Sequence, residues 1–136
     1  MSDYVRADVD NYAWRARLMR APMTHDSMTD KRIVFSTASS EEEARKIARH
    51  LVEHKLAACV NIVPHVESIY RWQDKVESAR EWLLLIKTTA EGFVAVRDAV
   101  LELHSYDVPE CVAIAVDDGS LEYLEWVADS VRVGEE

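Results

Sequence analysis

Apolar residues recur along the chain with two periods, and the alternation between these periods predicts the order of strands and helices. Residues 32–37 (RIVFST) are β-branched and aromatic, which predicts a strand. The next segment has apolar residues at helical spacing, which predicts an amphipathic helix with one buried stripe. The members of this stripe are Ala44, Ile47, Ala48, Leu51 and Val52. Ser39 with Glu42, and Ser40 with Glu43, match the capping box that begins such a helix.

Two long strand-like segments follow, residues 57–72 (AACVNIVPHVESIYRW) and residues 76–89 (VESAREWLLLIKTT). Asp74 and Lys75 offer a tight connection, so the two segments predict a hairpin whose turn type stays open because glycine is missing. At about 3.3 Å per residue the first segment would extend roughly 50 Å. A compact domain of about 105 residues is only about 35 Å across. The hairpin is therefore expected to overhang or bend, with Pro64 as the point of departure because proline cannot donate to a ladder.

The remaining chain predicts a helix, a short strand and a last helix. Thr88 and Glu91 are the expected caps of the first of these helices, and SYDVPE at 105–110 ends it because proline disfavours helix in the preceding residue. ECVAIAVDDG at 110–119 predicts a strand, and Ser120 is the expected cap of the last helix. The apolar faces are Phe93, Val96, Val100 and Leu103 in the first helix and Leu121, Leu124, Val127 and Val131 in the second.

The order strand, helix, strand, strand, helix, strand, helix predicts an α+β fold. Two split βαβ units with right-handed crossovers give a ferredoxin-like antiparallel sheet with helices on one face, here with an added C-terminal helix. Residues 32–136 form this domain, and residues 1–31 are interpreted as a partly ordered N-terminal extension. The alternatives for the extension are a natural chain start near Met28 and a short helix from Asn11 to Met19 that docks on the body.

The parity of the long strands predicts two different sheet faces. In the first long strand, one face carries Val60, Ile62 and Val66, and the other carries Cys59, Asn61, His65 and Glu67. In the second, one face carries Trp82, Leu84 and Ile86, and the other carries Leu83 and Leu85. Helices can cover only one of these faces. The remaining apolar surface and the overhanging strand edge therefore predict strand pairing and sheet burial between subunits.

Composition narrows the function classes. A chain of 136 residues with 49% hydrophobic content predicts one ordinary domain. The net charge of -9 argues against nucleic-acid and anionic-membrane partners, because both attract basic surfaces. The two cysteines, Cys59 and Cys111, lack CxxC spacing, so a disulfide framework and a structural zinc site are not indicated and a reducing cytoplasm is expected. No glycine-rich phosphate-binding loop is present.

Four short motifs carry a family resemblance. AACVNI at 57–62, the pair Tyr70 and Trp72, IKTT at 86–89 and YDVPE at 106–110 occur in this order on the predicted strand framework. Over residues 32–132 the chain resembles the CutA family of divalent-cation tolerance proteins. The resemblance implies a ferredoxin-like homotrimer whose long hairpins pair with neighbouring subunits, similar in assembly to the nitrogen-regulatory PII proteins. It implies no catalytic reaction; copper binding and metal tolerance are the associated properties.

The resemblance and the residue chemistry suggest several metal-ligand candidates. Metal-binding bacterial members have proposed copper ligands at the positions of Ser36, Leu103 and His104, so His104 alone keeps a ligating side chain. Cys59 is a soft ligand suited to copper(I), although it lies too far along its strand to share an ion with His65. A half-buried structural cysteine is the alternative. His50 and His54 have the i, i+4 spacing that can chelate a metal, or they belong to a solvated helix face.

The polar and aromatic residues of the family-like motifs suggest a candidate cleft between subunits. Its members are Cys59, Tyr70, Trp72, Lys87, Tyr106 and Glu110. Lys87 is expensive to bury unless it is paired, and Glu110 is the expected partner. The alternative to a ligand pocket is an interface ion pair with aromatic packing.

Three functional hypotheses follow for the chain. The first is a cytoplasmic, non-enzymatic CutA-type homotrimer linked to divalent-metal tolerance, with copper as the candidate metal. The second is a PII-like sensor that binds a small anionic ligand near Lys87. The third is a trimeric scaffold without a ligand.

Overall fold

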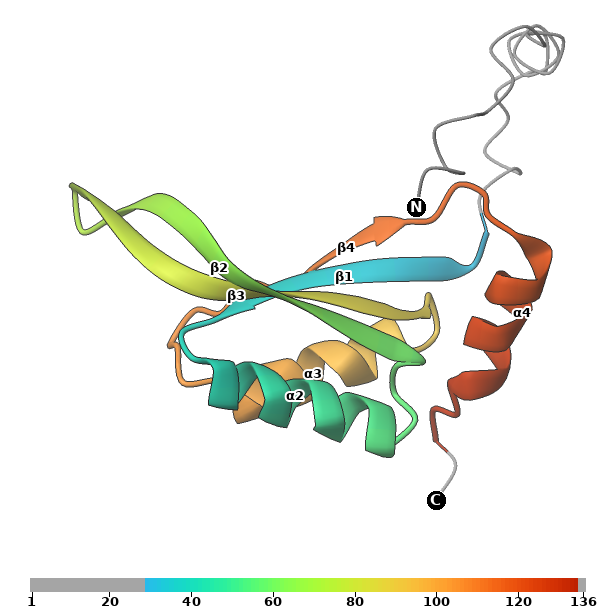
Figure 1. Ribbon diagram of the computed structural model, residues 1–136. Coiled ribbons are helices and arrows are strands. Elements are labelled where there is room, and N and C mark those ends of the chain that lie inside the picture. Colours follow the sequence, from blue (N-terminus) through green and yellow to red (C-terminus); the bar gives the residue numbers. More distant parts are fainter. Residues whose placement is uncertain (1–28, 135–136) are drawn as a thin grey trace, which may run out of the picture.

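The structure, a computed structural model, describes residues 29–134 and shows an antiparallel sheet with helices packed on one face (Figure 1). The four strands lie in the order β2-β3-β1-β4, which confirms the predicted ferredoxin-like arrangement. The elements are β1 (Lys31–Ala38), α2 (Glu41–Glu53), β2 (Cys59–Trp72), β3 (Lys75–Thr89), α3 (Phe93–Leu103), β4 (Val112–Ala115) and α4 (Leu121–Ser130). The predictions for residues 1–28, including the helix from Asn11 to Met19, lie outside the described residues.

The core fills the space between the sheet and the two helices α2 and α3. Alternate residues of β1 and β3 point toward the helices, whose inward stripes meet them. The largest fully buried apolar side chains there are Val34, Ile47, Leu51, Leu84, Ile86, Val96 and Val100. Two residues of the predicted stripes are exposed, Val52 at the end of α2 and Leu121, 70% exposed, at the start of α4. Each lies at a helix end, beyond the layer that faces it.

Two of the three predicted helix N-caps are confirmed. Ser40 Oγ accepts from the Glu43 amide, and Ser120 Oγ accepts from the Tyr123 amide. The predicted cap at Thr88 is wrong, because Thr88 belongs to β3 and its hydroxyl donates to the Leu56 carbonyl. The α3 helix begins instead after Gly92. A Cβ at Gly92 would lie 2.6 Å from Thr88 Oγ1, so the close approach of this turn to β3 requires glycine.

A β-bulge divides the long hairpin where Pro64 was expected to interrupt it. Val63 pairs with Leu83 and Val66 pairs with Glu81, so two residues of β2 stand opposite one residue of β3. His65 supports the bulge with a positive φ of 60°. The extra residue reverses the parity of everything beyond it.

The predicted faces of β2 are therefore correct up to Val63 and wrong beyond the bulge. Val60 and Ile62 stand opposite Ile86 and Leu84 on the helix-covered side, as expected. Val66 stands opposite Glu81 and has moved to the face that carries Cys59. The sequence pattern could not predict this reversal of the strand faces. A proline marks an irregular position in a strand but does not show how many residues are inserted there.

The hairpin turn is one residue earlier than predicted. Trp72 pairs with Lys75, which leaves Gln73 and Asp74 as the two loop residues. Their φ values of 49° and 65° are both positive. This is the type I′ geometry, which matches the twist of the strands and normally favours glycine at the second loop position.

The second face of the sheet, named here the open face, carries no helix over its middle. Register places Ile33 opposite Ile114 and Phe35 opposite Val112, and Leu85 stands on the other side of Phe35. Val112 is 54% exposed and Ile114 47% exposed in the single chain. The predicted apolar surface on the side of Leu83 and Leu85 is therefore present. Its members are Ile33, Phe35, Val63, Leu83, Leu85, Val112 and Ile114.

Because Asp74 sits at a position that favours glycine, Asp74→Gly is expected to stabilise the chain. The free energy of unfolding should rise by roughly 0.5–1 kcal/mol, since the left-handed conformation costs glycine nothing. Urea denaturation measures the change. Ser78→Gly, in the paired part of the same hairpin, is the matched control and should destabilise. A decrease for Asp74→Gly would contradict the assigned turn.

Candidate functional site

The predicted site residues lie in separate parts of the single chain. Cys59 and Lys87 are paired across β2 and β3 near the α4 end of the sheet. Tyr70 and Trp72 are exposed on the overhanging part of the hairpin. The loop after α3 holds the others, with His104 and Tyr106 in contact and Glu110 exposed. The single chain therefore forms two small clusters and does not form one continuous site.

Both ring nitrogens of His104 make hydrogen bonds within the chain. Nε2 lies 2.7 Å from the Thr37 carbonyl oxygen, and the Tyr106 amide donates to Nδ1 at 3.1 Å. Because a carbonyl can only accept, Nε2 carries the proton and Nδ1 carries the lone pair. The side chain is 0% exposed. The imidazole thus ties the end of α3 to β1, and its lone pair is already used within the chain.

Glu43 holds the same loop from the side of α2. Its carboxylate accepts from the Ser105 amide at 2.6 Å and from the Ser105 hydroxyl at 2.9 Å. Burial alone would raise the pKa of Glu43, but these hydrogen bonds outweigh it and hold the pKa below the ordinary value. The capping-box pattern marked Glu43, whose side chain accepts from the Ser39 hydroxyl at 3.2 Å beside the helix start and also binds Ser105, 62 positions away in sequence.

Tyr106 reaches the base of the hairpin overhang. Its hydroxyl donates to Glu81 Oε2 at 2.7 Å, and Glu81 is only 7% exposed although it is charged. Burial and the neighbouring Glu81 carboxylate raise the pKa of Tyr106 above its ordinary value. Sequence reasoning missed Glu81, because it lies in an alternating strand where an outward acidic residue is ordinary. Only its contact with the distant loop reveals its role.

Cys59 and Lys87 form the second cluster. Lys87 Nζ lies 3.8 Å from Cys59 Sγ, and no ion pair joins Lys87 to Glu110 within residues 29–134 of the single chain. A pocket of about 200 Å³ adjoins Lys87 and is also lined by Arg32 and by Tyr123 of α4. Burial and the proximity of Cys59 raise the pKa of Tyr123 above its ordinary value. The lining is mostly apolar, and its charged members are Lys31, Arg32, Lys87 and Asp118. The excess of cationic groups suits a small anion.

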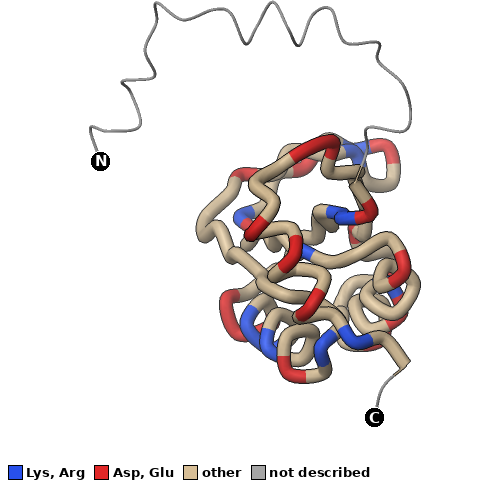
Figure 2. The backbone as a smooth tube through the Cα atoms, turned by 90° about the vertical axis from the view of Figure 1, so that its right-hand side faces the viewer, with Lys and Arg blue, Asp and Glu red and all other residues tan. Residues whose placement is uncertain are grey.

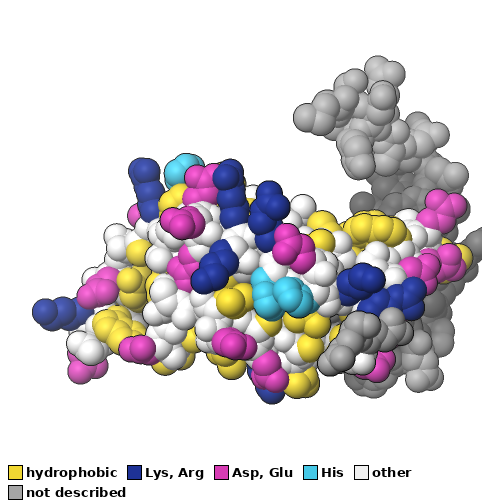
Figure 3. Space-filling model, turned by 90° about the horizontal axis from the view of Figure 1, so that it is seen from below, with side chains coloured by type: hydrophobic (Ala, Val, Ile, Leu, Met, Phe, Trp, Pro, Cys, Tyr) yellow, Lys and Arg dark blue, Asp and Glu magenta, His cyan; other side chains and the backbone are white. Residues whose placement is uncertain are grey.

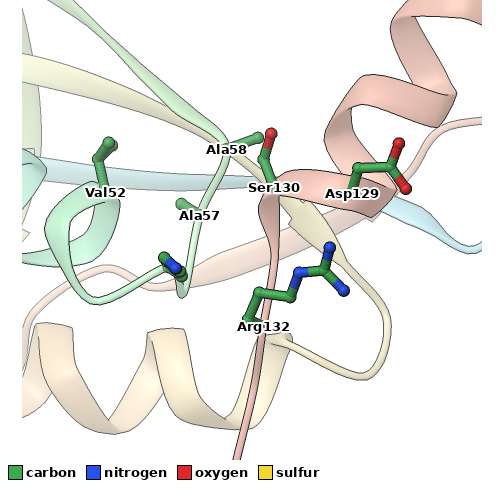
Figure 4. Close-up of a pocket in the computed structure, with 7 residues that line it drawn as sticks. Val52, Ala57, Ala58, Asp129, Ser130 and Arg132 are labelled. Atoms are coloured by element: carbon green, nitrogen blue, oxygen red, sulfur yellow. The ribbon is translucent and has the colours of Figure 1, made fainter. Parts of the chain in front are cut away.

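A larger hollow of about 380 Å³ lies between the end of α2 and the end of α4 (Figure 4). Val52 and Ala57 line one side, while Ser130 and Arg132 line the other. The Arg132 amide donates to the Lys55 carbonyl at 2.9 Å, which links the two ends. None of the predicted site residues belongs to this hollow. It explains the exposure of Val52, which faces this hollow and lies outside the core.

The residues at the family's copper positions do not fit a copper centre in the single chain. Ser36 is buried with no hydrogen-bond partner for its hydroxyl, Leu103 cannot ligate, and His104 uses both nitrogens. Within residues 29–134 there is no group of three or more histidine, cysteine, aspartate or glutamate side chains arranged to hold a metal. His104 and Cys59 as ligands therefore stay predictions, without support from this geometry.

Comparison with known proteins decides the family. The family model described as CutA1 divalent ion tolerance protein matches residues 32–130. The chain belongs to the CutA family. The divalent-cation tolerance protein CutA of Thermus thermophilus is 51% identical over 98 residues, which are 72% of this chain and 95% of that relative. The chloroplastic CutA of Arabidopsis thaliana is 45% identical over 100 residues, 74% of this chain but only 55% of that longer relative.

Solved CutA structures share the fold over most of the described chain. The Thermus thermophilus protein superposes with a TM-score of 0.74 at 49% identity, covering 75% of this chain and 99% of that one. CutA from Xylella fastidiosa gives a TM-score of 0.75 at 40% identity and covers 76% and 100%. The Thermus thermophilus protein is named a divalent-cation tolerance protein, and none of these three names mentions an enzymatic reaction. That the chain is not an enzyme stays a prediction.

The Glu43 contacts predict an acid-dependent loss of stability. Because its folded pKa is lowered, Glu43 contributes stability above the ordinary value of 4.5, and this is lost as the pH falls through the folded pKa. Glu43→Gln should lower the free energy of unfolding by about 1.5–3 kcal/mol at pH 7. Urea denaturation over a series of pH values from 7 downward should show the difference between the two proteins shrinking as the pH falls. A difference independent of pH would mean that charge is not involved.

Proposed function

We propose that the chain acts in divalent-cation tolerance as a homotrimer, and that the open face and the hairpin are its assembly surfaces. Membership of the CutA family supports the tolerance role. The observation that carries the assembly is the uncovered apolar side of the sheet. A monomer would leave a contiguous row of Ile33, Phe35 and Leu85 in contact with water.

The hairpin supports the same proposal through its backbone. Beyond the bulge, β2 and β3 pair only with each other, and their outer edges carry unpaired amide and carbonyl groups. The tip also exposes Tyr70 and Trp72, which suit contact with a neighbouring subunit. Figure 1 shows this ribbon projecting past the ends of α2 and α3. Three such hairpins would each gain an edge partner in a closed trimer.

The proposal also covers the cellular compartment of the chain and its partners other than further copies of itself. Within residues 29–134 no helix is long and apolar enough to cross a membrane. Acidic and basic positions are interspersed around the backbone (Figure 2). We assign the chain to the cytoplasm, without a nucleic-acid or membrane partner. Relatives differ in this respect, since the Arabidopsis protein is named chloroplastic and the Archaeoglobus fulgidus structure is named periplasmic.

Assembly through the open face predicts a different result for two matched lysine substitutions. Leu85→Lys places a charge in the middle of the open face and should convert the trimer to smaller species, because burying an unpaired charge is costly. Leu101→Lys, on the exposed side of α3, should leave the trimer intact. Light scattering coupled to size exclusion measures the mass. A monomeric wild type, or a trimer that tolerates Leu85→Lys, would contradict the assignment.

A second candidate function is supported by the pocket beside Lys87. Three cationic residues and one acidic residue, Asp118, line this mainly apolar pocket, and the excess of positive charge suits a small anionic ligand, as expected for a PII-like sensor. Inorganic phosphate, citrate and ATP in metal-free buffer should then raise the melting temperature of the wild type. Lys87→Met should abolish this shift, while Lys75→Met at the hairpin turn should keep it. Shifts that are equal in both variants would point to a general salt effect, and no shift would favour a ligand-free scaffold.

A further inference from the structure

Two histidines lie one turn apart on the solvent side of α2 and contact each other. The ring centroids of His50 and His54 are 4.1 Å apart and their planes differ by 25°. His54 is exposed and His50 partly exposed, so the pair is reachable from solvent. Figure 3, which looks onto the helix side of the molecule, shows histidine surface near the middle of that side. The loop network around His104 and the pocket beside Lys87 involve neither ring.

A backbone contact fixes the proton position of one ring. Nδ1 of His54 lies 2.9 Å from the His50 carbonyl oxygen. Because this oxygen can only accept, Nδ1 must carry the proton. In the neutral ring Nε2 then carries the lone pair. Metal-binding histidines characteristically donate their other N–H to a carbonyl in this way, which orients the ring and increases its basicity.

We propose that His50 and His54 form a surface site for a borderline divalent transition-metal ion such as zinc(II), nickel(II) or copper(II). Two imidazole nitrogens that share a tetrahedral ion at about 2.1 Å lie about 3.4 Å apart. Rings whose centroids are 4.1 Å apart can reach this separation by side-chain rotation, without a change in the helix. Imidazole suits these ions better than it suits magnesium or calcium.

The position on the helix favours a cation. His54 is the C-cap of α2, at the negative end of the helix dipole. Glu53 adds an exposed carboxylate next to the pair. Arg49 and Lys55 lie nearby in sequence and oppose the effect, but they are exposed and screened by salt. Two protein ligands with water in the remaining positions predict weaker binding than in a closed four-ligand site.

This inference is separate from the proposed assembly and does not use the family's copper positions. It needs only α2, whose two histidines belong to one subunit. The site therefore predicts one ion per chain, whatever the oligomeric state. Its failure would leave the assembly proposal untouched, and loss of the trimer would leave the site in place.

Isothermal titration of the metal-free full chain with nickel(II) and zinc(II) chloride tests the site. The wild type should bind one ion per chain. His50→Ala and His54→Ala should each weaken binding about tenfold or more, which corresponds to about 1.4 kcal/mol. His25→Ala, His65→Ala and His104→Ala should retain wild-type affinity, provided that circular dichroism shows each to be folded. Light scattering on every variant separates a binding defect from a change of assembly.

A spacing control keeps the composition constant. The double variant Val52→His with His54→Val moves the second histidine to an i, i+2 position, where it no longer faces His50. Binding should fall as in the single alanine variants. Substoichiometric nickel(II) should also broaden the amide resonances at the end of α2 in the wild type. Affinity retained in the double variant, broadening confined elsewhere, or no binding by the wild type would each overturn the proposal.

Discussion

Two helices can cover only one side of a four-stranded sheet, and this constraint shapes the rest of the molecule. In the chain, α2 and α3 cover one face of the sheet except for the projecting hairpin, while α4 reaches only the end of the other face. The β-branched and aromatic residues needed for a stable central strand thus leave apolar side chains uncovered on the second face, among them Phe35 and Leu85. A second protein surface packed against this face would remove these side chains from water.

The polar interactions of the chain serve the loop that follows α3. Glu43, Glu81 and Thr37 each bind a different residue of that loop, from a helix, from the hairpin and from β1. Three anchors on separate elements hold an irregular segment that has little apolar burial of its own. This structural role accounts for a histidine at position 104 without any metal-ligating side chain at Ser36 or Leu103.

Periodicity was sufficient to predict the element order, the sheet and most of the core, because buried stripes repeat visibly in α2 and β3. The periodicity gave wrong predictions at positions where a single residue changes the backbone geometry. The bulge at His65 reversed the face of Val66, and Gly92 replaced Thr88 as the start of α3. The candidate residues were found by motif, but their contacts depend on distant elements, and no local pattern linked Tyr106 to Glu81.

The bulge also separates two parts of the hairpin that can vary independently. On the body side, register is fixed by the packing of Ile62 and Leu84 beneath the sheet. On the other side only the two strands constrain each other, so residues added or removed in facing pairs would change the reach of the ribbon without disturbing the core. Hairpin length is thus an adjustable dimension of this architecture, and the body can stay constant while the distance to a neighbour changes.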